Sequence, residues 1–121
     1  MSRSVWFNCA AGVAGDMVLA ALVDAGADEL AIGAILGGLA LDDYALTFER
    51  TQRAGVGATR AVVAVHEHGS SHEHRSWKEI RDVLDRSDLP ARVRSRARAV
   101  FEVLADAEAK IHGVAPDRSE E

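Results

Sequence analysis

The sequence is poor in aromatic residues, proline, lysine and cysteine. Only 5% of its 121 residues are aromatic, so a hydrophobic core would consist mainly of alanine and aliphatic side chains. The single cysteine, Cys9, excludes a disulfide within the chain and is typical of a reducing cytoplasm. With a net charge of -5 and no basic block, the composition argues against nucleic acid as the main partner.

Long hydrophobic runs are also missing. No run approaches the roughly 20 residues that a transmembrane helix needs, and Val5-Trp6-Phe7 is too short for the core of a signal peptide. We therefore expect a cytoplasmic protein that does not bind a membrane. Its length suits one domain, which we place at residues 1–114, followed by a frayed tail at residues 115–121.

Hydropathy patterns in the first half of the chain predict one strand, two helices and a hairpin. Val5-Trp6-Phe7 is typical of a short buried strand, and residues 17–25 form an apolar helix that we expect to be buried on most sides. A second helix is predicted at residues 29–36. The alternating segment 44–49 and the valine-rich segment 60–67 predict an antiparallel hairpin.

Two helices are predicted in the second half. Ser76 and Glu79 have the spacing of a capping box, and a long helix should run from Pro90 to His112 and end at Gly113. The predicted order is β-α-α-β-β-α-α. This is an α+β fold with a small mixed or antiparallel sheet of three strands, packed against helices that include a long C-terminal one.

The segment His-Glu-His-Gly-Ser-Ser-His-Glu-His holds four of the five histidines, at His66, His68, His72 and His74. In an extended chain, residues two apart point to the same side, so each His-Glu-His triplet presents two imidazoles together. A turn at the central Gly-Ser-Ser would offer four nitrogens to one ion. Imidazole suits nickel, zinc, copper and iron alike. The alternative is a solvated polar loop that binds nothing in particular.

A small-residue loop precedes the first predicted helix and resembles a cradle for anions. Gly12 and Gly15 would leave backbone N–H groups open at the positive end of the helix, and Asp16 would require a cation between itself and a phosphate. The alternative is a tight turn in which Asp16 caps the helix, and local sequence favours this turn. Catalytic residues stay unknown, with Cys9 and Asp16 as the candidates. Cys9 is either a soft metal ligand or nucleophile, or a small buried residue.

The run from Asn8 to Met17, followed by Leu22-Val23-Asp24-Ala25-Gly26, resembles the opening of the LarC-type nickel insertion proteins. Members of that family typically carry Asp-Cys-x-Ser/Ala-Gly-Ile-x-Gly-Asp-Met and then Leu-x-Asp-x-Gly. The later run Ala107-Glu108-Ala109-Lys110-Ile111-His112-Gly113 is similar to the family's Ala-Glu-Ala-x-x-His-Gly. The resemblance therefore covers nearly the whole chain.

The resemblance implies a role in making the nickel-pincer nucleotide, the cofactor of lactate racemase. Family members insert nickel into pyridinium-3,5-bisthiocarboxylic acid mononucleotide in a CTP-dependent step. It implies nickel binding at the histidine segment, and binding of either the precursor or CTP with a divalent cation at the loop that holds Gly12, Gly15 and Asp16. CTP and a divalent cation would bind to a C-terminal domain of the family.

Two departures from the family pattern limit what the resemblance implies. Asn8 stands where members usually have aspartate, and the chain stops where they continue with His-Phe-His-Glu-Val-Gly and a C-terminal domain. We expect the chain to be the N-terminal part of a nickel insertase, acting with the precursor nucleotide, with a separate C-terminal LarC-like subunit or with a second copy of itself. The alternatives are a nickel metallochaperone without catalysis and a non-catalytic structural or regulatory subunit.

Overall fold

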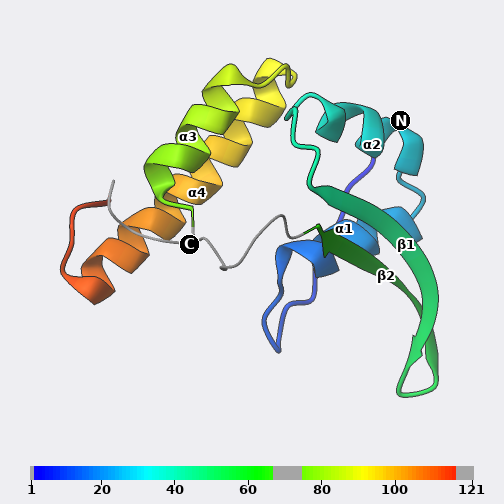
Figure 1. The fold of residues 1–121 in the computed structure, drawn as a ribbon. Coiled ribbons are helices and arrows are strands. Elements are labelled where there is room, and N and C mark those ends of the chain that lie inside the picture. Colours follow the sequence, from blue (N-terminus) through cyan, green and yellow to red (C-terminus); the bar gives the residue numbers. More distant parts are fainter. Residues whose placement is uncertain (1, 67–74, 117–121) are drawn as a thin grey trace. The chain divides into compact units, whose positions relative to one another are not determined.

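The computed structural model describes residues 2–66 and 75–116 (Figure 1). These residues form four helices and one antiparallel sheet of two strands. In chain order the elements are α1 (Gly15–Asp24), α2 (Glu29–Gly37), β1 (Tyr44–Arg53), β2 (Val56–Val65), α3 (Trp77–Arg86) and α4 (Ala91–His112). They fall into two compact units: unit 1 contains α1 and the β1–β2 hairpin, and unit 2 contains α2, α3 and α4.

The hairpin of unit 1 is built around a two-residue turn. Ala54 and Gly55 both have positive φ, 50° and 79°, which is the backbone of a type I′ turn between the paired residues Arg53 and Val56. This turn matches the right-handed twist of the strands, and Gly55 adopts it without strain. The predicted hairpin is therefore confirmed, with longer strands than the hydropathy pattern suggested.

The first predicted strand is wrong, and so is the order that began with it. Val5-Trp6-Phe7 forms no strand, and the Trp6 side chain is 93% exposed. A strand needs a neighbour for its backbone N–H and C=O groups, and within the described residues β1 and β2 pair only with each other. The observed order is α-α-β-β-α-α. The α+β class is confirmed, but the sheet has two strands rather than three.

α1 begins earlier than predicted and ends in a Schellman motif. Gly26 has a φ of 101°, and its N–H donates to the Val23 carbonyl while the N–H of Ala27 donates to that of Leu22. The expectation that α1 is buried on most sides is wrong, because Ala20 is the only buried residue in the helix. α1 packs on the hairpin through one face.

In unit 2, the start of α3 is fixed by the predicted capping box. The Ser76 N–H donates to Glu79 Oε2 over 2.7 Å, and the Glu79 N–H donates to Ser76 Oγ over 3.4 Å. The N–H of Ser76 holds the pKa of the Glu79 carboxyl below its ordinary value, since it stabilises the charged form. Trp77 directly follows the cap, so the capping box also orients the largest side chain of this helix.

α3 and α4 pack together around Trp77. The indole is 3% exposed and stacks on the Phe101 ring, with centroids 6.3 Å apart. Ala105 and Ala109 are buried on the same side of α4, where their small side chains allow close approach. This pair of helices supplies most of the buried apolar residues of unit 2.

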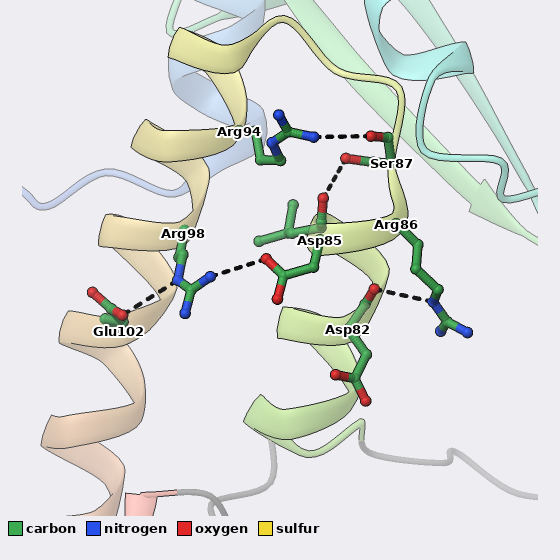
Figure 2. Close-up of polar contacts among 8 residues, drawn as sticks. Asp82, Asp85, Arg86, Ser87, Arg94, Arg98 and Glu102 are labelled. Carbon is green, nitrogen blue, oxygen red and sulfur yellow. Dashed lines mark hydrogen bonds and ion pairs between the residues drawn. The ribbon is translucent and has the colours of Figure 1, made fainter.

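Polar contacts tie the α3–α4 connection to both helices (Figure 2). Arg94 donates to the Ser87 carbonyl over 3.2 Å, and the Ser87 hydroxyl donates to the Leu84 carbonyl. Arg98 donates to Asp85 over 2.9 Å and faces Glu102 one turn along α4. Both pairs of Arg98 are exposed, so each contributes little to stability, and only the pair with Asp85 joins the two helices.

The segment after α2 makes a close backbone contact with the α3–α4 connection. The Asp88 N–H donates to the Gly38 carbonyl over 2.8 Å, and a Cβ atom on Gly38 would lie 2.4 Å from the Asp88 carbonyl oxygen. Glycine is therefore required here by the approach of another backbone. Among the residues that the structure describes, no helix combines the length and apolar character needed to span a membrane.

The two tryptophans provide a matched test of the packing in unit 2. We expect Trp77→Ala to lower the free energy of unfolding by about 3–5 kcal/mol, because it removes a buried indole from between two helices. Trp6→Ala should change it by roughly 0.5 kcal/mol or less, since Trp6 is exposed. Urea denaturation followed by far-ultraviolet circular dichroism measures both. Similar losses in the two variants would contradict the described packing.

Candidate functional site

The position of α1 on the hairpin depends on one carboxylate. Asp24, the last residue of α1, accepts hydrogen bonds at Oδ1 from Arg50 Nη1 and from Thr59 Oγ1, each over 2.6 Å. Arg50 also donates to Thr59 Oγ1 over 3.0 Å. Arg50 and Thr59 face each other in the β1–β2 register, so one carboxylate joins the end of the helix to both strands.

From Asp24 toward the start of α1, the helix packs along β2 in the direction of the C-terminal end of the strand. Ala20 lies one helical turn before Asp24 in α1, and Ala61 lies two residues after Thr59 in β2. Both alanines are buried. A helical turn and two strand residues cover similar distances, about 5.4 and 6.6 Å. The helix therefore runs antiparallel to β2, and its start lies toward the end of the strand, as Figure 1 shows. We call this end of unit 1 the candidate site, formed by residues 9–16 and His66.

The loop at the candidate site is a tight exposed turn. The Gly12 N–H donates to the Cys9 carbonyl over 2.9 Å, and Gly12 has a φ of 82° that favours glycine. Gly15 is the first residue of α1, and a Cβ atom there would meet nothing within 4 Å. Thus local packing does not require a glycine at position 15. Cys9 is a free, exposed thiol, which overturns its interpretation as a small buried residue.

The turn interpretation predicted that Asp16 caps α1, and the structure contradicts this prediction. The capping position is Ala14, which has no side-chain cap, and Asp16 lies in the first turn. Asp16 Oδ1 accepts from the Met17 N–H over 2.9 Å. The reason for the difference is that α1 starts at Gly15 rather than at Met17. An anion at this helix start would meet the Asp16 carboxylate, so a cation would have to lie between them.

Only one predicted metal ligand falls within the described residues. His66 directly follows β2 and is exposed, at the same end of unit 1 as the start of α1. His68, His72 and His74 lie outside the described residues. Within residues 2–66 and 75–116, no group of three or more histidine, cysteine, aspartate or glutamate side chains could hold a metal ion. The structure thus brings His66 and the glycine loop to one end, and the four-histidine site stays a prediction.

Sequence reasoning missed the Asp24 contacts that set this arrangement. The Thr59 hydroxyl lowers the pKa of the Asp24 carboxyl below its ordinary value of 3.8, and the hydrogen bond and charge of Arg50 add to this. Loss of hydration acts in the opposite direction. The one available signal was the position of Asp24 in the Leu-x-Asp-x-Gly run. The run marks the helix end but carries no information about which strand it meets.

Comparison with known proteins identifies relatives of the chain over most of its length. Residues 5–120 match the family described as nickel insertion protein. The chain is 39% identical over 114 residues to a Staphylococcus saprophyticus protein named pyridinium-3,5-bisthiocarboxylic acid mononucleotide nickel insertion protein. Proteins of the same name from Nocardioides and Geobacillus kaustophilus are 40% and 38% identical to it, over 114 and 119 residues. No solved structure matches the chain.

These alignments cover nearly all of the chain but a small part of each relative. They span 94% of the chain for the Staphylococcus saprophyticus and Nocardioides proteins and 93% for that of Geobacillus kaustophilus. The same alignments span 28%, 28% and 29% of the three relatives. Most of the length of each relative therefore has no counterpart in this chain.

The Asp24 contacts predict a pH-dependent stability. The folded-state pKa of Asp24 is lowered, so its contribution is present above about pH 3.8 and is lost as the pH falls through the folded-state pKa. We expect Asp24→Asn to unfold at lower urea than the wild type at neutral pH, and the two midpoints to converge as the pH falls through the lowered folded-state pKa of Asp24. Asp106→Asn, which removes the same charge from an exposed position on α4, is the control. A midpoint difference that stays constant with pH would contradict the role of Asp24.

Proposed function

Since the chain belongs to the nickel insertion protein family, we propose that it is the part of such a protein that binds nickel and presents it to the cofactor precursor. The precursor would be pyridinium-3,5-bisthiocarboxylic acid mononucleotide, after the name that the relatives carry. The observation on which this proposal rests is the shared location of the glycine loop, the start of α1 and His66 at one end of unit 1. Nickel and precursor would meet there.

In this proposal the histidine segment holds the nickel before transfer. Neutral imidazole nitrogens are good ligands for Ni²⁺, and four of them belong to His66, His68, His72 and His74. His66 is exposed directly after β2, so the segment starts at the candidate site. The sulfur of the exposed Cys9, in the same loop as Gly12, would add a softer donor for the ion during transfer.

The glycine loop and the start of α1 would bind the phosphate of the precursor. Backbone N–H groups at a helix start and the positive end of the helix dipole favour a phosphate. Gly12 and Gly15 leave the backbone open to close approach. Asp16 opposes a bare phosphate, so we propose that a divalent cation lies between the Asp16 carboxylate and the phosphate oxygens.

Completion of the reaction would depend on residues outside this chain. Insertion would form one carbon–nickel and two sulfur–nickel bonds in the precursor, and the ring carbon would lose its proton to a base as the carbon–nickel bond forms. We assign the binding of CTP and its divalent cation to the part of the relatives that this chain does not match. That part would act in cis or as a separate C-terminal subunit. A nickel metallochaperone without catalysis is the second candidate, favoured by the same histidine segment.

Nickel titration tests the proposed metal ligands. We expect the variant with His66, His68, His72 and His74 all changed to alanine to bind Ni²⁺ at least about tenfold more weakly than wild type in isothermal titration calorimetry. His112→Ala is the matched control, because it removes the one histidine outside the segment, which pairs with Glu108 on α4. Equal nickel affinity of the fourfold variant and the wild type would exclude the segment as the metal site.

Product formation separates an insertion protein from a metallochaperone. With nickel, CTP and the precursor, we expect the chain alone to form no nickel-pincer nucleotide. Product should appear when the remaining part of the Nocardioides relative is co-expressed with the chain. Mass spectrometry of the nucleotide fraction detects the added nickel. Nickel binding without product in either arm would favour the metallochaperone.

A further inference from the structure

α4 has a second apolar face that the α3–α4 packing does not use. Phe101, Ala105 and Ala109 lie on the packed side of the helix. Another set of apolar residues is exposed, with exposed fractions of 67% at Val100, 72% at Val103 and 77% at Ile111. We call this set the exposed stripe; it consists of Val93, Val100, Val103, Leu104, Ala107 and Ile111.

The exposed stripe is continuous along the helix. Val100, Leu104, Ala107 and Ile111 follow one another at spacings of four, three and four residues, which places them on one face. From Val93 to Ile111 the stripe extends over about 27 Å at 1.5 Å per residue. It lies about a third of a turn from the packed side, so a single helix presents two separate apolar faces. Sequence analysis of the helical spacing cannot divide these residues into two faces without knowing where α3 lies.

Contiguous exposed apolar surface of this kind usually marks a protein interface. One border of the exposed stripe is mainly basic, because Arg92 and Lys110 are exposed along it, beside the single carboxylate of Asp106, and Arg96 lies just inside it. Antiparallel pairing of two copies about the middle of the stripe would bring Arg92 of one copy toward Lys110 of the other. Like charges at that position disfavour a second copy as the occupant. A partner with an apolar surface flanked by carboxylates would cover the exposed stripe and also pair with the basic residues at its border.

We propose that the exposed stripe of α4 is the docking surface for the rest of a nickel insertion protein. The occupant is an apolar helix or sheet face with acidic residues at its edge, supplied by the region that makes up most of each relative and has no counterpart here. This inference rests on the proposed function for the identity of the partner. It does not depend on nickel, CTP or the precursor.

Co-purification tests this surface directly. The tagged chain is co-expressed with the unmatched region of the Nocardioides relative, and the two are recovered without nickel or nucleotide. We expect the wild type to retain the partner region in equal amounts. Val100→Asp and Val103→Asp, which place a charge within the stripe, should each retain at least about tenfold less. Lys110→Glu should weaken retention most at low salt, since it places a negative charge against the acidic edge of the partner and salt screens that repulsion.

Ser95→Asp is the matched control, because Ser95 is exposed on α4 outside both apolar faces. It should retain the partner region as wild type does, and circular dichroism should show equal helix content in all variants. Equal retention by the stripe variants and the control would overturn the proposal, as would no retention by the wild type. A chain that forms a dimer, abolished by Val103→Asp, would assign the stripe to a second copy instead. If the wild type retains the partner region but does not bind nickel, the proposed function alone is contradicted.

Discussion

The arrangement of unit 1 depends on the Asp24 carboxylate. Its Oδ1 atom accepts from a residue of each strand, and it is the last residue of the helix that packs on them. Ala20 and Ala61 are the only fully buried residues of α1 and the two strands, so packing of these small side chains leaves the register of α1 to be set in part by other contacts. Directional hydrogen bonds to one charged group supply that register. Because α1 is anchored at its C-terminal end, its N-terminal end is free to present the glycine loop beside the end of β2.

This division of roles explains why the two ends of α1 differ in chemistry. At the anchored end, Asp24 Oδ1 accepts from Arg50 and Thr59, and Arg50 also donates to Thr59, so these polar groups join the helix to both strands. At the other end, Cys9, Gly15 and Asp16 are exposed, and no side chain caps the helix. An uncapped helix start leaves backbone N–H groups for a ligand, whereas a capping serine or asparagine would occupy them. The lack of a side-chain cap at Ala14 therefore makes the start of α1 less stable, at the end where ligand binding is proposed.

Local signals in the sequence predicted most elements correctly, apart from the cap predicted at Asp16, and the missing strand and the missed Asp24 contacts depend on residues far apart in the sequence. The Ser76–Glu79 capping box, Gly26 and Gly113 each act within one helical turn, so their effect can be read from the sequence. Val5-Trp6-Phe7 carries no such signal, because whether three apolar residues form a strand depends on a partner strand elsewhere. The contact of Asp24 with Thr59 has the same character, since it joins residues 35 positions apart. At the candidate site, the sequence indicated the donor types, and the structure added that the glycine loop and His66 share one end.

The exposed apolar residues of both units have a common physical interpretation. Val63 and Val65 continue the apolar face of β2 beyond α1, and Trp6 is almost fully exposed near the chain start. A two-stranded hairpin of this kind gains stability when a further strand or layer covers it. In unit 2 the exposed stripe of α4 presents the same kind of surface. Water contact at so many large apolar side chains costs free energy that burial would recover, at about 25 cal/mol per Å². Burial of either surface by a partner would therefore favour binding.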